Sequence, residues 1–189
     1  MKFNSPNILT LLRIALIPVF VVVFYLPFTW APPVSALVFA LAAVTDWFDG
    51  WLARRWNETS AFGAFMDPVA DKLMVVAALV LILQADPRVA MAIPVMIIIG
   101  RELTISALRE WMAELGSRKR LAVSWLGKVK TAAQMVAIVL LLYRYPLASV
   151  PIYDLGVGLL VIAAALTLWS MSLYLLAAWP ELKRDRSAP

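Results

Sequence analysis

The sequence predicts an all-α integral membrane protein with six transmembrane helices, on three observations. Hydrophobic residues make up 63% of the 189-residue chain and the mean hydropathy is +0.84, whereas soluble domains are about 45–50% apolar. Charged residues make up only 15%, compared with about 25% in soluble chains. Apolar runs also recur at about the 20-residue length that crosses a bilayer as a helix. The length suits one membrane domain covering residues 1–189.

Six apolar runs supply the predicted spans. The first run contains Arg13 near its start, and residues 2–8 before it are expected to form a short N-terminal interfacial segment. Charged residues interrupt the second to fifth runs towards one end, so we expect a hydropathy scan to miss one or two of them. The sixth run has no charged residue and is the clearest. The predicted spans cover residues 9–28, 34–54, 67–84, 89–112, 124–143 and 155–179.

The basic residues fix the predicted orientation, because loops on the cytoplasmic side of a membrane carry an excess of Lys and Arg. With both termini inside (N-in/C-in), the outer loops keep only Arg88 and Arg144. The ionisable residues within the spans then gather at the cytoplasmic ends. The basic residues on the cytoplasmic side are Lys2, Arg54, Arg55, Arg118, Lys119, Arg120, Lys183, Arg184 and Arg186.

The residue types that are missing narrow the chemistry. The chain has no Cys and no His, so a bound metal must be held by oxygen ligands, which favour Mg, Mn or Ca over Zn. The net charge of +5 does not indicate a nucleic-acid binder, because the basic residues lie at the ends of apolar runs.

Four aspartates lie near the predicted cytoplasmic ends of the second and third spans. Asp46 and Asp49 are three residues apart, and Asp67 and Asp71 are four apart, so each pair shares one face of its helix. Two helices joined by a short loop can oppose these faces, which would bring four carboxylates together. Each intramembrane Asp costs about 2.5–3.5 kcal/mol and the four would repel one another. The pattern therefore predicts a site for one or two hard divalent cations.

The residues between these aspartates fit a bound diphosphate. Gly50 and Ala53 are small and leave room for a bulky group beside the second helix. Gly63 is expected in the turn before the third helix, and Arg54 can reach a phosphate at the membrane surface. Two cations about 3.5–4 Å apart could clamp the attacking and leaving oxygens of a phosphoryl displacement.

The alternative interpretation is that the aspartates are structural partners of Lys72, Arg54 and Arg101. For a single intramembrane Asp this alternative would carry equal weight. Four aspartates at helical spacings, with only one Lys among them, favour the metal site.

The pattern D-x2-D-G-x2-A-R-x8-G-x3-D-x3-D over residues 46–71 resembles the signature of the CDP-alcohol phosphotransferases, with every position filled. The resemblance implies six transmembrane helices, a homodimer, and transfer of a phosphatidyl-type group from a CDP-linked donor to an alcohol with release of CMP. It implies two metal ions, Mg²⁺ or Mn²⁺, held by Asp46, Asp49, Asp67 and Asp71, with Asp71 also the general base. The residues implied to bind the CDP-lipid are Asp46, Asp49, Gly50, Ala53, Arg54, Gly63 and Asp67.

A second group of residues is basic and indicates a phosphorylated acceptor. Arg101 lies deep in an apolar run, and a buried cation in a span is a functional candidate. An Arg with Lys and a hydroxyl suits a phosphomonoester dianion. The alternative is that Lys128 and Lys130 are ordinary flanking residues and that Arg101 pairs with Glu102 or an aspartate. The predicted acceptor-phosphate pocket comprises Arg101, Arg109, Lys128, Lys130 and Thr131.

Further motifs resemble the bacterial branch of this family that uses glycerol 3-phosphate. These motifs are residues 6–13, residues 100–102 and residues 127–131, and they imply that Asn7, Thr10 and Arg13 line the site. The substrates implied are CDP-diacylglycerol and glycerol 3-phosphate, in phospholipid biosynthesis at the cytoplasmic face of the inner membrane. Serine, inositol phosphate and phosphatidylglycerol remain alternative acceptors of the same chemistry.

A different class of function, a divalent-cation transporter that uses the aspartates as its ion site, is the remaining rival. Transporters place such sites near the bilayer midplane and often contain inverted repeats. In this chain the acids lie near the predicted cytoplasmic ends and no internal repeat is found. The sequence therefore favours the enzyme.

Overall fold

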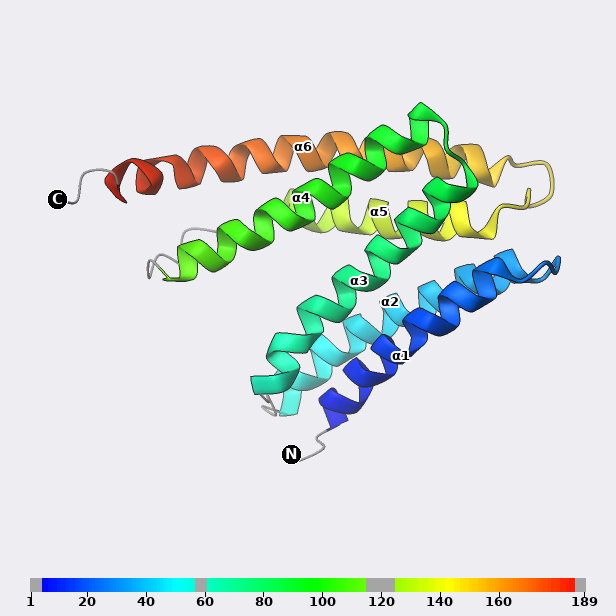
Figure 1. Ribbon diagram of the computed structural model, residues 1–189, viewed down its shortest axis with the longest axis horizontal. Coiled ribbons are helices and arrows are strands. Elements are labelled where there is room, and N and C mark those ends of the chain that lie inside the picture. Colours follow the sequence, from blue (N-terminus) through cyan, green and yellow to red (C-terminus); the bar gives the residue numbers. More distant parts are fainter. Residues whose placement is uncertain (1–4, 57–60, 115–124, 186–189) are drawn as a thin grey trace.

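In the computed structural model, the residues that are described form six α helices, as the sequence predicts (Figure 1). It describes the backbone of residues 5–56, 61–114 and 125–185, and the side chains of residues 11–45, 66, 69–70, 72–108, 110–111 and 129–176. Within these ranges there is no strand, only an isolated bridge between Leu147 and Val150. The helices are α1 (Ser5–Tyr25), α2 (Ala31–Trp56), α3 (Ala61–Ala85), α4 (Val89–Glu114), α5 (Trp125–Tyr143) and α6 (Ile152–Asp185).

Several helices begin earlier or end later than the predicted spans. Helix α1 begins at Ser5, so residues 5–8 belong to this helix and not to a separate interfacial segment. Helix α3 begins at Ala61, so the prediction that Gly63 lies in a turn is wrong, and this glycine occupies the first turn of α3. At α1, backbone hydrogen bonding continues beyond the apolar run into the more polar residues 5–8. At α3, residues 61–66 are apolar, and the helix simply continues through Gly63 despite the low helix propensity of glycine.

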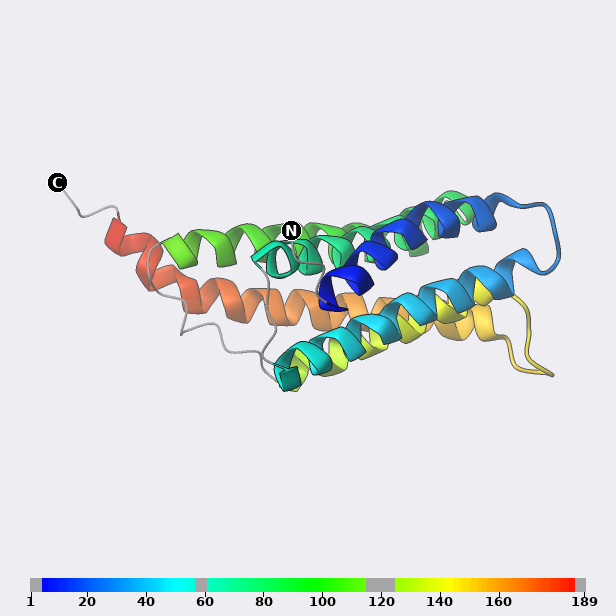
Figure 2. The same ribbon diagram turned by 90° about the horizontal axis from the view of Figure 1, so that it is seen from below.

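Successive helices run in alternating directions, so the bundle has two distinct ends (Figures 1 and 2). The N-terminal ends of α1, α3 and α5 and the C-terminal ends of α2, α4 and α6 lie towards the left of Figure 1. We call this the polar end, because Asp46, Asp49, Asp67 and Asp71 all belong to it. The opposite end, called the loop end, carries the connections at residues 26–30, 86–88 and 144–151.

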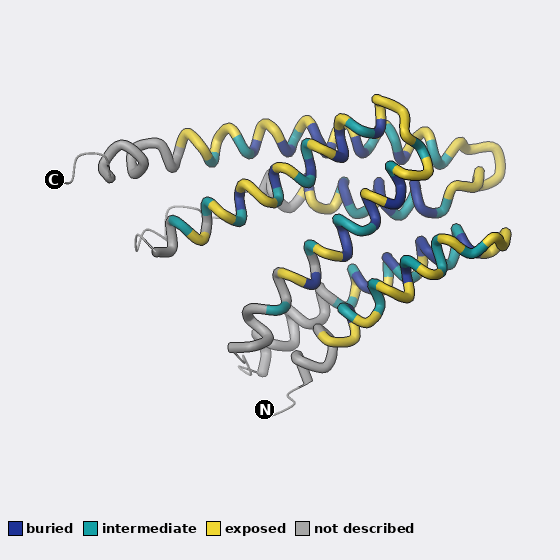
Figure 3. Tube along the Cα trace, viewed as in Figure 1, coloured by how far each residue is buried: buried dark blue, intermediate teal, exposed yellow. Residues whose placement is uncertain are grey.

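Two helices of the described chain are long and apolar enough to cross a membrane, over Val89–Leu108 and Ile152–Leu176. Only 33% and 28% of the residues in these stretches are buried, which distinguishes them from the core helices of a soluble protein. Within the residues whose side chains are described, the other four helices contain apolar stretches of 10–17 residues, over Leu11–Tyr25, Ala31–Thr45, Lys72–Ala85 and Val129–Tyr143. Exposed residues run along all the coloured parts of the helices in Figure 3, and many of them are large and apolar.

The core lies between the helices and is built from apolar side chains of α1 to α6. Phe20, Phe39, Leu79, Ile138 and Leu160 are among its fully buried members. Helices α5 and α6 pack against each other most extensively, and α2 and α4 cover them. Helix α1 in turn packs on α2 and α3, so it lies on the side of the bundle away from α6.

The close approach of α6 to α5 depends on Gly156. A Cβ atom at this position would lie 3.0 Å from Cγ of Leu141 and 3.2 Å from Cβ of Leu140. Gly158, two residues further along on the opposite, exposed side of α6, has open space where its Cβ would be. Gly156 thus has a packing role that Gly158 lacks.

We expect Gly156→Ala to destabilise the protein by about 1–2 kcal/mol, because overpacking costs about 1–3 kcal/mol and a helical Ala recovers part of that. Thermal unfolding of the detergent-solubilised protein measures the effect. Gly158→Ala is the matched control and should leave the melting temperature unchanged or slightly raised. Equal melting temperatures for the two variants would contradict the packing role of Gly156.

The loop end is held together by side chains of its connections. Both carboxylate oxygens of Asp86 accept hydrogen bonds from Arg88 at 2.7 Å, and the hydroxyl of Tyr153 on α6 donates to Oδ2 of Asp86 at 2.7 Å. The guanidinium of Arg88, followed by the Tyr153 hydroxyl, holds the pKa of Asp86 well below its usual range. Arg144 lies 4.9 Å from the centre of the Phe24 ring. The two basic residues predicted outside therefore both have local partners.

Candidate active site

The four aspartates occupy the polar end of two consecutive helices. Asp46 and Asp49 lie in the C-terminal part of α2, and Asp67 and Asp71 lie in the N-terminal part of α3. Their side chains fall outside the described residues, as do those of Gly50, Ala53, Arg54 and Gly63. The expectation that the four carboxylates converge is therefore a prediction supported by helical register alone.

Helical register continues the buried face of α2 into the aspartate positions. Ser35, Phe39 and Ala42 are buried at intervals of four and three residues, and the same intervals lead on to positions 46 and 49. Because this face packs inside the bundle, the register assigns positions 46 and 49 to the inner side of α2.

The same holds for α3 when it is followed towards its N-terminus. Met74 and Ala78 are buried, and Asp71 occupies the position one turn before Met74 and two turns before Ala78. Asp67 lies one further turn away. Helices α2 and α3 contact each other and both contact α5, so the two register lines belong to adjoining helices.

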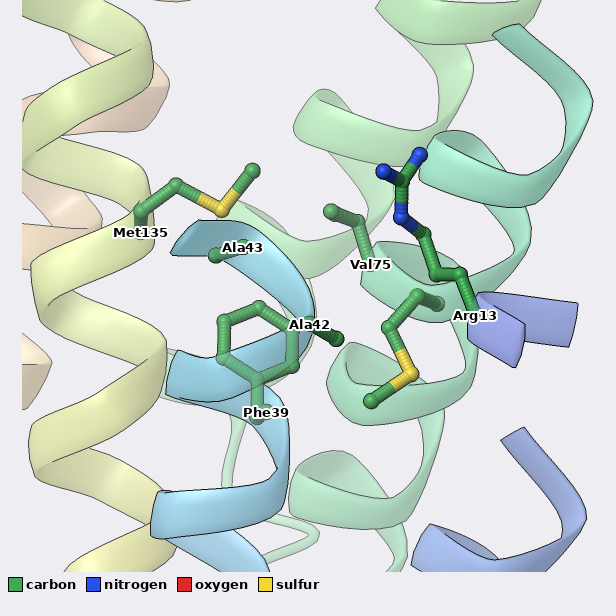
Figure 4. Close-up of a pocket in the computed structure, with 7 residues that line it drawn as sticks. Arg13, Phe39, Ala42, Ala43, Val75 and Met135 are labelled. Carbon is green, nitrogen blue, oxygen red and sulfur yellow. The ribbon is translucent and has the colours of Figure 1, made fainter. Parts of the chain in front are cut away.

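A small cavity lies about one turn further into the bundle from the aspartate positions. It has about 10 Å³ of room, which is near the minimum that one water molecule needs. Figure 4 shows Arg13 reaching from α1 towards α3, opposite Phe39, Ala42 and Ala43 of α2 and Met135 of α5. The lining residues are Arg13, Phe39, Ala42, Ala43, Met74, Val75 and Met135.

Arg13 is the one predicted site-lining residue of α1 whose side chain is described. It is only 2% exposed, which is rare for an Arg unless it serves a partner or a site. Thr10 lies one turn before it on α1 and Asn7 two turns before it, with side chains outside the described residues. Helix α1 packs on α2 and α3, so these positions adjoin the aspartate-bearing helices.

The basic group predicted on α4 and α5 forms a cluster around Glu102. Nη1 of Arg101 lies 2.5 Å from Oε1 of Glu102, and Nζ of Lys130 lies 3.9 Å from the same oxygen. The side chains of Arg101 and Lys130 are 9% and 2% exposed, so both cations are removed from solvent. The structure therefore shows the pairing of Arg101 with Glu102 that the sequence analysis gave as an alternative. Lys130 approaches the same carboxylate.

One edge of the Arg101 guanidinium is not taken up by Glu102. Its Nε atom is buried and has no hydrogen-bond acceptor among the described residues. A buried donor left unsatisfied costs about 1–3 kcal/mol, so an anion that accepted this hydrogen bond would recover that cost. The cluster can thus accept a compact anion such as a phosphate.

The remaining members of the predicted acceptor pocket are not all brought together. Thr131 is exposed although its neighbour Lys130 is buried, because adjacent residues lie on different faces of a helix. Lys128 shares a register line with Thr131, three residues away, and its side chain lies outside the described residues, as does that of Arg109. The structure thus joins Arg101 and Lys130, and Thr131 lies on a different, exposed face of α5.

Two residues that the sequence did not assign to this cluster connect it to α3. Nζ of Lys72 donates a hydrogen bond to Oγ of Ser106 at 2.5 Å, and this hydroxyl donates to the backbone oxygen of Glu102 at 2.6 Å. Lys72 directly follows Asp71, so α3 is fastened to α4 beside an aspartate position. The four-residue spacing of Glu102 and Ser106 was visible in the sequence, but nothing in it indicated the contact with α3.

Comparison with known protein families identifies the family to which this helical chain belongs. Residues 3–169 match the model of the CDP-alcohol phosphatidyltransferase family, so the chain belongs to this family and the predicted resemblance is confirmed. Members of the family generally use a divalent metal.

Curated relatives within the family are similar over almost their whole length. The chain is 58% identical to the CDP-diacylglycerol--glycerol-3-phosphate 3-phosphatidyltransferase of Salmonella typhimurium (strain LT2), across 182 residues. It is 56% identical to the protein of the same name from Escherichia coli (strain K12), also across 182 residues. Each alignment covers 96% of this chain and 98% of the relative.

Proposed function

We propose that this protein transfers the phosphatidyl group of CDP-diacylglycerol to the 1-hydroxyl of sn-glycerol 3-phosphate, giving phosphatidylglycerophosphate and CMP. The observation that carries the proposal is the 56–58% identity, over 96% of the chain, to relatives with this activity in their names. The complete aspartate signature and the buried basic cluster on α4 and α5 support it from the residues themselves.

Asp46, Asp49, Asp67 and Asp71 are proposed to hold two Mg²⁺ or Mn²⁺ ions. The residues fit this group, because carboxylate oxygens are the ligands that hard cations prefer and the chain has neither His nor Cys to compete. When bound, the ions would neutralise the diphosphate and the charge that develops on departing CMP. The inner-side register of these positions on α2 and α3 is consistent with such a role.

The CDP-lipid is proposed to bind along α2 and the start of α3. Gly50, Ala53 and Gly63 leave space for the cytidine beside the helix backbones, and Arg54 binds a phosphate oxygen. The acyl chains remain in the bilayer against the apolar outer surface. Gly63 lies in the first turn of α3, four residues before Asp67. Its proposed role therefore does not require the loop between α2 and α3 in which the sequence placed it.

The acceptor phosphate is proposed to bind at Arg101 and Lys130. Two buried cations lie at one carboxylate oxygen in this cluster, and a pair of cations so close together suits the two negative charges of a phosphate dianion. The Nε atom of Arg101, which has no acceptor among the residues that the structure describes, offers a directed donor for a phosphate oxygen. Arg109, Lys128 and Thr131 are proposed to line the outer part of the pocket, nearer to the membrane surface.

The reaction is proposed to be one direct displacement. The carboxylate of Asp71 takes the proton of the 1-hydroxyl, and that oxygen forms a bond to the β-phosphorus of CDP-diacylglycerol. The bond from this phosphorus to the oxygen of the CMP moiety breaks, and the electron pair leaves with CMP. Chemistry of this kind depends mainly on positioning and on charge, and it requires no covalent enzyme intermediate.

We also propose that all six helices span the cytoplasmic membrane with both termini inside, and that the protein is a homodimer. The two apolar helices and the exposed apolar side chains support insertion in a bilayer. The excess of basic residues at the polar end supports placing the active site at the cytoplasmic face.

A panel of acceptors tests the proposed function directly. Purified protein in detergent with CDP-diacylglycerol and Mg²⁺ should release CMP when glycerol 3-phosphate is added. Serine, inositol phosphate and phosphatidylglycerol should give little or no release, and a chelator should stop the reaction. Release that depends on another member of the panel, and not on glycerol 3-phosphate, would overturn the acceptor assignment.

A further inference from the structure

Glu102 is the residue at which three helices of the site are connected. Its carboxylate lies 2.5 Å from Nη1 of Arg101 on α4 and 3.9 Å from Nζ of Lys130 on α5. Its backbone oxygen accepts the hydrogen bond from Ser106, whose hydroxyl accepts one from Lys72 on α3. One residue thus relates the positions of two buried cations and of the helix that carries Asp71.

The charge balance explains why a carboxylate is needed there. The side chains of Arg101 and Lys130 are nearly fully buried, and they approach the same carboxylate oxygen, so they would repel each other without it. Glu102 is 24% exposed, which leaves it partly accessible from outside the cluster. A carboxylate shared by two cations holds them near one point, at which an incoming dianion can meet both.

The geometry at Arg101 shows which of its donors Glu102 leaves available. Glu102 engages Nη1, while the buried Nε has no acceptor among the described residues. Arg binds phosphate best through two neighbouring N–H groups, and the edge that includes Nε provides such a pair. Fixing Nη1 therefore orients the guanidinium so that its other edge remains for a ligand.

We propose that Glu102 is the positioning residue of the acceptor-phosphate site. Its carboxylate holds Arg101 and Lys130 in the arrangement that binds the phosphate of the acceptor, without touching the reacting atoms. This inference rests on the proposed function, because it concerns the phosphate of glycerol 3-phosphate. It goes beyond that function by assigning an acidic residue a part in binding an anion.

The test is the separate measurement of kcat and of KM for each substrate in Glu102→Gln. The substitution removes the negative charge and retains the size of the side chain. We expect KM for glycerol 3-phosphate to rise by about 10-fold or more, since hydrogen bonds to charged groups contribute enough for such a factor. KM for CDP-diacylglycerol should change by less than about twofold, because a purely structural defect would not select one substrate.

Two further variants keep the outcome decisive. Glu102→Asp retains the charge but has a shorter side chain, so KM for glycerol 3-phosphate should rise to an intermediate value. If Glu102→Gln does not accumulate in the membrane, Glu102→Asp alone tests the inference. Glu110→Gln is the matched control, because Glu110 is an exposed acidic residue two turns further along α4. Its two KM values should equal those of the wild type.

An unchanged KM for glycerol 3-phosphate in either Glu102 variant would overturn the inference, as would equal increases in both KM values. Failure of the proposed function itself has a different signature. In that case the wild-type protein would release no CMP with glycerol 3-phosphate, whatever the variants did.

Discussion

Asp71→Asn is expected to lower the rate of CMP release by at least about 10³-fold, while the protein still accumulates in the membrane. A general base contributes about 10²–10⁴-fold to catalysis, and Asn cannot accept the proton of the acceptor hydroxyl. Insertion should be largely preserved, because Asn is neutral and costs less to place in a span than Asp. The rate is measured with saturating CDP-diacylglycerol and glycerol 3-phosphate on detergent-purified protein.

The dependence on metal concentration separates the two roles proposed for Asp71. If Asp71 served only as a metal ligand, raising Mg²⁺ or Mn²⁺ would restore much of the rate in Asp71→Asn. If Asp71 is the general base, the loss of activity in Asp71→Asn should persist at every metal concentration. Asp154→Asn is the control, because Asp154 is an exposed acid in the first turn of α6 at the loop end, and its rate should match the wild type. Full activity of Asp71→Asn would contradict the assignment of the base.

The number and order of the helices could be predicted from the sequence because each apolar run is long and separated from the next by a polar or Pro-containing stretch. The predicted start of the fourth span at Val89 and the predicted end of the fifth at Tyr143 agree with α4 and α5. The early start of α3 was missed for another reason. Residues 61–66 are apolar, but Gly63 favoured a turn because of its low helix propensity, whereas backbone hydrogen bonding carries the helix through it.

The candidate site was predictable where chemistry lies along one helix and not where it depends on contacts between helices. The spacing of Asp46 and Asp49 assigns both to one face of α2, since periodicity reports faces of a single helix. Periodicity does not show which faces of different helices meet. From the sequence, Lys72 could be considered only as a counter-ion of the aspartates, whereas in the structure it donates a hydrogen bond to Ser106 of α4. The burial of Lys130 beside an exposed Thr131 is likewise decided by the packing of α5.

Arg101→Met is expected to raise KM for glycerol 3-phosphate by about 100-fold or more, with KM for CDP-diacylglycerol changed by less than about twofold. The factor corresponds to about 2.7 kcal/mol, within the range of one or two charge-assisted hydrogen bonds to phosphate. Met retains most of the apolar stem, so the packing of α4 is little disturbed. Glu102 keeps Lys130 at 3.9 Å as its counter-ion, so the substitution does not leave a buried carboxylate alone.

A comparison with Arg101→Lys distinguishes directed hydrogen bonding from simple charge at this position. Lys preserves the positive charge but lacks the paired N–H edge, so we expect an acceptor KM between those of the wild type and Arg101→Met. Arg144→Met is the control, because Arg144 lies at the loop end against Phe24, and neither KM should change. If Arg101→Met raised both KM values equally, Arg101 would have to be assigned to the overall structure of the site. An acceptor KM that Arg101→Lys left at the wild-type value would mean that charge alone, and not the geometry set by Glu102, binds the phosphate.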